Sequence, residues 1–255
     1  MILHASKIEG FKLQASDGAI GAITDFLFDD TTWQIRWLVI ETGSWLSGRK
    51  VLLPPSALGH VNHIGHQFSV RLTRQQVKDS PSVDTDEPVS RQMESGLYGY
   101  YGWVPYWSTG FYMGGYGYTG GLMEPPGPGF ATAEANAASA AHGDPCLRSV
   151  REITGYGLDA DDGEIGHVVD VLIEDADWSV HYLVADTRNW WPGKKVLISP
   201  RSIASIDWSP RLVHLDISRE HLKGSPAYDG SQAVDRAYEY AYHGYYDAKR
   251  VIEPA

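Results

Sequence analysis

Apolar runs and alternating apolar and polar positions recur along this chain, and both patterns are typical of β-strands. The runs IGAITDFLF and IGHVVDVLI, which begin at Ile20 and Ile165, are too apolar for surface strands and predict strands buried on both faces. The runs that follow, WQIRWLVIET and WSVHYLVADT, alternate apolar and polar side chains in their first halves. The shorter runs KVLL, FSVRL, KVLI and LVHLDI predict further strands. The chain is therefore predicted to be mainly β.

The second half of the chain repeats the first half at a constant offset of 145 residues, so that Gly18 recurs as Gly163. About a third of the residues between positions 2 and 101 recur between positions 147 and 246 without a gap. Solenoid units are shorter than this period, so the repeat indicates two complete domains of one fold.

The repeated dipeptides Asp17-Gly18 and Asp162-Gly163 predict hairpin turns, because glycine adopts the positive φ that such turns require. Each copy then contains five or six short strands joined by tight turns. Such strands suit a small closed antiparallel barrel, since closure leaves no exposed edge. We expect two small antiparallel β-barrels in tandem.

The end of each copy changes to a helical period. The apolar face of each predicted helix has corresponding members in the two copies, namely Val89, Met93, Leu97, Tyr100 and Tyr101, and Val234, Tyr238, Tyr242, Tyr245 and Tyr246. We expect an amphipathic helix after each barrel, with a first domain over residues 1–102 and a second over 147–255. The apolar stripe of each helix could cover its own barrel, the other barrel or a second copy of the chain, and the last arrangement would be a homodimer.

The segment between these domains, residues 103–146, differs from both in composition. It interleaves aromatic residues with glycine, continues with PPGPG and ends rich in alanine, which is typical of a flexible linker. Its aromatic residues include Trp103, Tyr106 and Trp107, which would form a costly exposed patch in water. They could pack back on the protein, form a partner-binding surface or stay disordered as low-complexity sequence.

The net charge of −11 argues against binding to nucleic acid or anionic lipid, because both require clustered lysine and arginine. No apolar run is long enough to cross a bilayer, and the start MILHASKIEGF lacks the features of a secretory signal. The lone cysteine, Cys146, fits a reducing compartment. We expect a cytoplasmic protein without membrane insertion.

The two copies DGAIGAITDFLFD…WQIRWLVIETGSWLSGRKVLLPPSAL and DGEIGHVVDVLIE…WSVHYLVADTRNWWPGKKVLISPRSI resemble the PRC-barrel domain. This fold is shared by the cytoplasmic part of the photosynthetic reaction-centre H subunit and the C-terminal domain of the ribosome maturation factor. The tails VSRQMESGLYGYYGWVPYW and VDRAYEYAYHGYYD are similar to the segment that follows the barrel in bacterial stand-alone members. The resemblance implies a six-stranded barrel and a binding or scaffolding role without catalysis. The membrane helix of the H subunit and the N-terminal barrel of the maturation factor have no counterpart here.

His60, His63 and His66 have the three-residue spacing that could place imidazoles around one metal ion. The second copy has other residue types at these positions, so the fold does not need the histidines. They are interpreted as loop histidines, with a metal site as the alternative.

Asp25 and Asp170 recur within apolar strands, where an unpaired carboxylate would be costly. Lys50 and Lys195 recur as well and could supply partners. A structural ion pair or backbone hydrogen bonds explain the four residues. An acid or base role would need a pocket with other polar groups converging on it.

Trp45, Trp190 and Trp191 each lie close to a glycine followed by two basic residues. Tryptophan beside arginine or lysine is a good anchor at protein interfaces, but it can equally cap the open end of a small barrel.

The sequence thus predicts a non-catalytic adaptor or scaffold that binds a protein partner and needs no cofactor. One alternative is a binder of a small ligand or a metal, or an enzyme, that uses a pocket between the barrels. A second alternative is an assembly factor related to the ribosome maturation factor.

Overall fold

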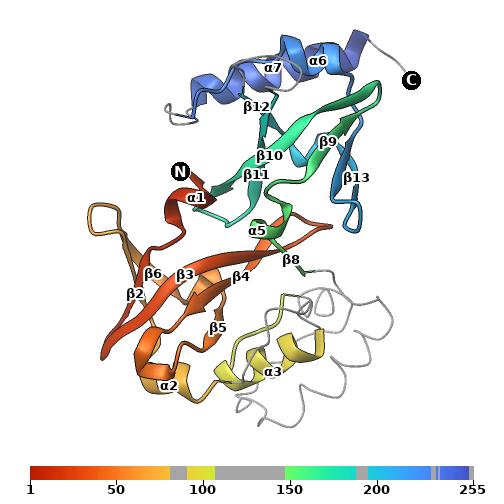
Figure 1. The fold of residues 1–255 in the computed structure, drawn as a ribbon. Helices are drawn as coiled ribbons and strands as arrows, with labels where there is room; N and C mark the ends of the chain where they lie inside the picture. The colour runs from red at the N-terminus through yellow and green to blue at the C-terminus, as the bar shows by residue number, and fades with distance from the viewer. Residues whose placement is uncertain (81–90, 107–146, 188–194, 231–233, 235, 253–255) are drawn as a thin grey trace, which may run out of the picture. The chain divides into compact units, whose positions relative to one another are not determined.

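The computed structural model describes residues 1–80, 91–106, 147–187, 195–230, 234 and 236–252 (Figure 1). The chain divides into two compact units. The first contains residues 1–11, 23–38 and 148–255, and the second contains residues 12–22 and 39–147. These units do not follow the boundaries of the sequence repeat, because the first unit takes in residues 1–11 and 23–38 of the first copy.

The first copy forms a seven-stranded sheet with the order β5-β4-β3-β2-β7-β6, in which β8 also pairs with β3. Its strands are β2 (Lys12–Ala15), β3 (Gly18–Asp29), β4 (Gln34–Glu41), β5 (Lys50–Leu53), β6 (Leu58–Asn62), β7 (Gln67–Val70) and β8 (Leu147–Ser149). The helices of this copy are α1 (Ala5–Ile8), η1 (Gly43–Leu46), η2 (Pro55–Ala57), α2 (Arg74–Lys78) and α3 (Arg91–Tyr101).

The second copy repeats this topology with the order β12-β11-β10-β9-β14-β13, in which β1 also pairs with β10. Its strands are β1 (Ile2–His4), β9 (Gly157–Ala160), β10 (Gly163–Glu174), β11 (Val180–Asp186), β12 (Lys195–Ile198), β13 (Ile203–Asp207) and β14 (Leu212–Leu215). Its helices are α5 (Val150–Ile153), η3 (Pro200–Ser202), α6 (Arg219–Gly224) and α7 (Arg236–Ile252).

The expected pair of mainly β domains is confirmed, but the expected closed and wholly antiparallel barrels are wrong. Among the described residues, the chain of paired strands in each sheet does not return to its start, so the sheets are open. β2 runs parallel to β7, and β9 runs parallel to β14. The prolines that end β5 and β12 lead into the one-turn helices η2 and η3 instead of hairpins, because proline has no backbone N–H for strand pairing. The strands on either side of each short helix therefore stay at opposite ends of the sheet.

The long apolar strands form the cores, as their sequence predicts. Phe26, Phe28, Trp37 and Leu38 in β3 and β4 are all almost completely buried. Their counterparts in β10 and β11 are equally buried. Burial of large side chains is the main source of stability, at about 25 cal/mol per Å² of apolar surface.

Both predicted Asp-Gly turns form hairpins, and each aspartate also holds a helix. Gly18 and Gly163 have the positive φ values of 143° and 126°. The Asp17 carboxylate accepts a hydrogen bond from the backbone N–H of Arg74 at 2.8 Å, and Asp162 does the same for Arg219 at 2.7 Å. Each turn is thereby tied to the first residue of α2 or α6.

The first strand of each copy belongs to the sheet of the other copy. β1 pairs antiparallel with β10, with Ile2 opposite Glu174 and His4 opposite Leu172. β8 in turn pairs with β3. The amino terminus of the chain also forms ion pairs with Glu174 and Asp175. The two copies therefore exchange equivalent strands, an arrangement that the sequence reading did not predict.

Asp170 binds the exchanged segment of the first copy. Its carboxylate accepts hydrogen bonds from His4 Nδ1 at 2.7 Å, from Ser6 Oγ at 2.6 Å and from the Ser6 backbone N–H at 3.2 Å. His4 Nε2 lies 2.6 Å from the hydroxyl of Tyr228, which continues the network. Burial works to raise the pKa of Asp170, but the bonds from His4 and Ser6 hold it below its ordinary value.

Asp25 binds the exchanged segment of the second copy in the same way. It accepts hydrogen bonds from Ser149 Oγ at 2.5 Å and from the Arg151 backbone N–H at 3.1 Å. Here burial outweighs these bonds and raises the pKa of Asp25. Lys50 and Lys195, which the sequence suggested as partners, are exposed at the starts of β5 and β12.

A third pair of contacts joins the copies at the turns that precede β4 and β11. The Ile35 N–H donates to the Trp178 carbonyl, and the Val180 N–H donates to the Trp33 carbonyl, both at 2.8 Å. These four residues correspond to one another in the repeat, so the two bonds are reciprocal.

The exchange predicts that the two copies stay together when the chain between them is cut. We expect a protein with a protease site inserted after Gly129, cleaved completely, to elute as one species in size-exclusion chromatography at micromolar concentration. The paired strands, the Asp25 and Asp170 networks and the reciprocal bonds hold the fragments together without the connecting chain. Elution of separate fragments without denaturant would contradict the observed exchange.

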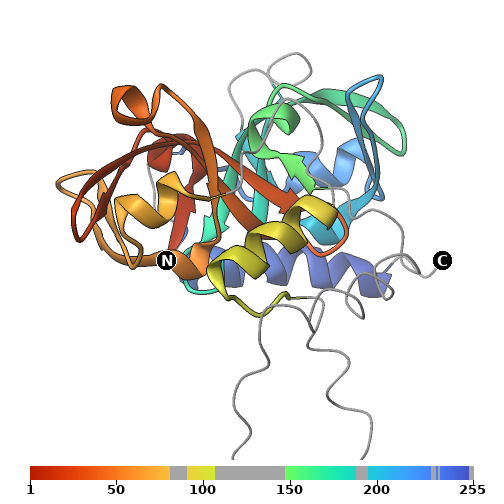
Figure 2. The ribbon, with the colours of Figure 1, turned by 90° about the horizontal axis from the view of Figure 1, so that it is seen from below.

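The two predicted amphipathic helices are present as α3 and α7, and each contacts its own copy. In α3, the Tyr100 hydroxyl donates to the Gln76 carbonyl at 3.0 Å. In α7, the Tyr242 ring meets Tyr182 of β11 edge-on at 5.0 Å, and α7 lies beside this sheet in both views (Figures 1 and 2). The aromatic stripe of α7 that suggested a homodimer is thus largely used within the chain. No described helix combines the length and the hydropathy needed to cross a membrane.

Candidate functional site

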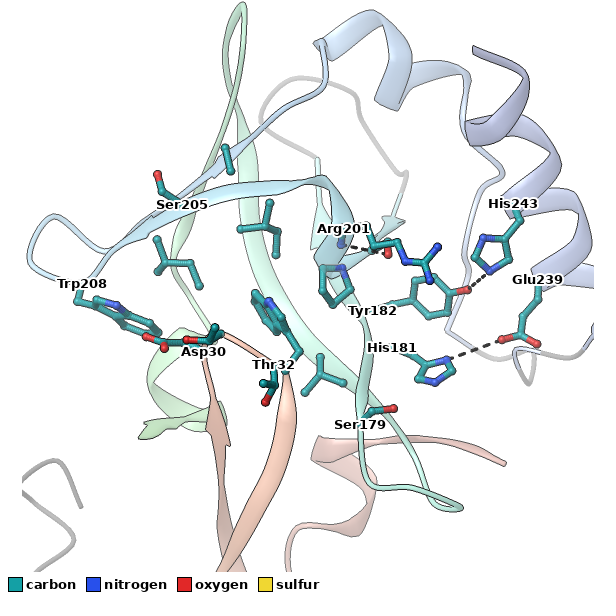
Figure 3. A pocket seen from close by; sticks show the side chains of 18 residues that line it. Asp30, Thr32, Ser179, His181, Tyr182, Arg201, Ser205, Trp208, Glu239 and His243 are labelled. Atoms are coloured by element: carbon teal, nitrogen blue, oxygen red, sulfur yellow. Dashed lines mark hydrogen bonds and ion pairs between the residues drawn. The ribbon is translucent and has the colours of Figure 1, made fainter. Parts of the chain in front are cut away.

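A hollow of about 730 Å³ lies within the first unit, and residues of both copies line it (Figure 3). The first copy contributes the turn between β3 and β4, residues 30–33. The second copy contributes the start of β11, η3, β13, Trp208 and two residues of α7. Its size is within the range of about 300–1,000 Å³ that is typical of ligand sites.

The turn between β3 and β4 places Trp33 against the hollow. The Asp29 carboxylate accepts hydrogen bonds from the backbone N–H groups of Thr31 and Thr32, both at 3.0 Å. Trp33 has a positive φ of 58°, which few tryptophans adopt, and its ring stacks on Phe28 with centroids 5.2 Å apart. The sequence predicted Trp33 as part of a strand face, but the positive φ makes it the last residue of the turn.

One end of the hollow is an aromatic and charged cluster around Trp208. The Arg148 guanidinium lies 4.2 Å from the Trp208 ring centroid and 3.4 Å from the Asp30 carboxylate. The Tyr156 ring meets Trp208 edge-on at 5.7 Å. Burial raises the pKa of Asp30, although Arg148 acts against this rise.

The other end is lined by side chains of β11 and α7 that contact one another. His181 Nδ1 lies 3.9 Å from the Glu239 carboxylate, and the Tyr182 hydroxyl lies 3.4 Å from His243 Nε2 (Figure 3). Burial raises the pKa of Tyr182 to about 12, with Arg201 acting against the rise, so its hydroxyl is neutral near pH 7. Tyr242 is not a lining residue but holds the lining residue Ser199, because its hydroxyl accepts a hydrogen bond from the Ser199 N–H at 3.0 Å.

The side of the hollow between these ends is formed by β13. Four consecutive residues of this strand line it, namely Ile203, Ala204, Ser205 and Ile206. β13 is the last strand in the order of its sheet, and Ala204 and Ser205 are exposed. The hollow therefore borders a strand edge.

The tryptophan and tyrosine residues that the sequence singled out do not line this hollow. Trp45 packs within the second unit, with its ring N–H bound to the Ile20 carbonyl and the Arg74 guanidinium 4.3 Å from its ring centroid. Trp107, Trp190 and Trp191 lie outside the described residues.

Trp103 and Tyr106 pack against α3 in the second unit. The Trp103 ring stacks on Tyr101 with centroids 4.2 Å apart. The Tyr106 hydroxyl lies 3.3 Å from the carboxylate of the fully buried Glu94. Both side chains are partly exposed, so a partner-binding role for them stays a prediction.

His60, His63 and His66 are all exposed, on β6 and the turn that follows it. Within the described ranges, no three His, Cys, Asp or Glu side chains are grouped to hold a metal ion. His63 corresponds in the repeat to Trp208, which does line the hollow.

Sequence reasoning did not identify the hollow, although it contained two signals. Trp33 recurs as Trp178, and Glu239 recurs as Glu94. The recurrence of a residue in both copies does not show which of the two residues lines a binding site.

Comparison with known proteins agrees with the fold. Residues 2–76 match the model of the PRC-barrel domain. An uncharacterized protein of Deinococcus radiodurans is 35% identical over 74 residues, which cover 29% of this chain and 26% of that protein. This chain therefore spans about a quarter of the relative that it matches. Residues 2–76, in the first copy, are thus similar to a PRC-barrel domain.

Proposed function

We propose that this protein is a non-catalytic binding protein, an adaptor or scaffold, and that the hollow in its first unit is its binding surface. The observation that carries the proposal is the lining of the hollow, which combines Trp33, Trp208, Tyr182 and the exposed Arg201. Tryptophan, tyrosine and arginine are the residues that contribute most to binding at protein interfaces. The second copy is proposed to be a PRC-type domain as well, because it has the same strand order as the first.

Binding without catalysis is favoured by the pairing of the polar groups in the hollow. His181 faces Glu239, and Tyr182 faces His243. A general base must be able to accept a proton near the working pH. The raised pKa of Tyr182 excludes its phenolate from that role at neutral pH.

A small ligand is the second candidate, because the volume of about 730 Å³ suits one. A thermal-shift screen with metals, nucleotides and tetrapyrroles tests it. A ligand at about 100 times its Kd stabilises the folded state by about 2.7 kcal/mol, which raises Tm by several degrees.

We expect Trp208→Ala to remove partner binding while Tyr240→Ala leaves it unchanged. Tyr240 lies on α7 next to Glu239, is 85% exposed and does not line the hollow. The measurement is affinity capture from an extract of the source cells, with wild type and both variants immobilised and bound proteins identified by mass spectrometry. Circular dichroism confirms that the variants fold.

A partner that binds the wild type and Trp208→Ala equally would place the binding surface elsewhere. Trp45, Trp103 and Tyr106 would then be the next residues to replace.

A further inference from the structure

We propose that the hollow takes an extended, basic segment of a protein partner, which pairs as an additional strand with the outer edge of β13. This inference rests on the proposed function and names the chemistry of the partner. Three observations support it: the position of β13 at the end of its sheet, the pairing of other strands of this sheet with additional chain, and the negative net charge of the protein.

β13 offers an edge that the described part of the chain leaves without a second strand. Among the described strands it pairs with β14, with Ser205 opposite His214 and Ile206 opposite Val213. It lies at one end of the strand order, and Ala204, Ser205 and Asp207 are exposed. An edge strand presents backbone N–H and C=O groups that pair with an extended peptide.

The other edge strand of this sheet, β12, and the inner strand β10 both pair with additional chain. Tyr228 forms a bridge with Lys195 at the start of β12, through a hydrogen bond from the Tyr228 N–H to the Lys195 carbonyl at 2.9 Å. β1, only three residues long, pairs with β10. The sheet therefore already binds short extended segments through their backbone.

The hollow lies alongside this edge, so that side chains of an added strand would enter it. Trp208 lies at one end of β13 and Tyr182 at the other end of the hollow (Figure 3). Apolar side chains at alternate positions of the peptide would contact these rings, because side chains of a strand alternate between two faces.

Charge favours a basic segment over a second copy of this chain. The lining itself is nearly balanced in charge, because Arg148 lies beside the Asp30 carboxylate and Arg201 is a lining residue together with Glu239 (Figure 3), so the overall charge of the chain decides. A second copy would bring another net charge of −11, whereas lysine and arginine side chains would be attracted.

The test is an array of fluorescent nonapeptides with lysine at every second position and Val, Ile, Leu, Phe, Tyr, Trp or Thr between. A matched array carries glutamate in place of lysine. We expect lysine peptides to bind the full chain in fluorescence anisotropy, more weakly at high salt, and glutamate peptides not to bind. Trp208→Ala and a central proline in the peptide should each weaken binding by at least about 10-fold, while Tyr240→Ala should not.

Hydrogen exchange locates the bound peptide. Strand addition should slow exchange of the backbone amides of residues 203–207, with the corresponding residues 58–62 of β6 as the internal control. Protection elsewhere, or binding that tolerates the central proline, would overturn strand addition.

The outcomes separate this inference from the proposed function. If no lysine peptide binds but a captured partner still depends on Trp208, the strand inference fails and the proposed function stands. If neither binding depends on Trp208, both fail. If a small molecule raises the Tm of the protein and no peptide binds, the occupant of the hollow is a small ligand and the strand inference fails.

Discussion

Replacement of Gly166 by alanine is expected to prevent folding or to lower the free energy of unfolding by about 4 kcal/mol or more, the range of exceptional single substitutions. A Cβ atom at Gly166 would lie 2.0 Å from the carbonyl oxygen of Asp186, on the neighbouring strand β11. Two backbones meet there, so no flexible side chain can move to relieve the overlap. Gly166 also has a φ of 139°, which L residues rarely adopt.

Gly21, the counterpart of Gly166 in the first copy, should behave in the same way, because its Cβ would lie 2.0 Å from the Glu41 carbonyl oxygen. The control is Gly244→Ala in α7, where the added Cβ meets nothing within 4 Å apart from the backbone of its own helix and its chain neighbours. Alanine at this helical position should raise the free energy of unfolding by about 0.5–1 kcal/mol. Urea denaturation followed by circular dichroism measures all three variants. A Gly166→Ala protein as stable as wild type would show that β10 and β11 do not approach as described.

Asp170→Asn is expected to lower the free energy of unfolding at pH 7 by about 2–3 kcal/mol, because it removes charge-assisted hydrogen bonds from His4 and Ser6 at a site that is 14% exposed. Asp25→Asn should cost about 1 kcal/mol or less, because the ionised Asp25 carboxylate is itself disfavoured by burial. The two substitutions should therefore lower the free energy of unfolding by different amounts, although the two aspartates bind equivalent segments.

The two variants should also differ in the sign of their pH dependence. The folded pKa of Asp170 is below its ordinary value of 3.8, so its stabilising contribution is present above pH 3.8 and is lost as the pH falls through the folded pKa. The folded pKa of Asp25 is above 3.8, so its contribution is present below pH 3.8 and is lost as the pH rises through the folded pKa.

The stability difference between wild type and variant should therefore shrink on acidification for Asp170→Asn and grow for Asp25→Asn. Urea denaturation at intervals between pH 2 and pH 7 measures both differences. Parallel pH profiles for the two variants would contradict the opposite environments of the two carboxylates. Asp161→Asn is a suitable control, because this aspartate is exposed and outside both networks.

The sequence was informative where short-range patterns decide the outcome. The apolar runs predicted β3 and β10, the Asp-Gly dipeptides predicted both hairpins, and the helical stripes predicted α3 and α7. The closure of each sheet into a barrel was predicted wrongly. Strand lengths do not reveal that the strands before and after the prolines that follow β5 and β12 lie at opposite ends of each sheet. The partners of Asp25 and Asp170 were also beyond prediction, since they lie on the other copy, more than a hundred residues away.

From residue periodicity and the internal repeat alone, it followed that this chain contains two mainly β domains of one topology, each ending in an amphipathic helix. Those features depend on neighbours within a few residues or on likeness between two segments. Tertiary contacts alone decided the strand exchange, the carboxylate networks and the hollow beside β13. Each of these depends on which distant segments meet, because Trp33 of one copy lines the hollow together with Tyr182 and Trp208 of the other.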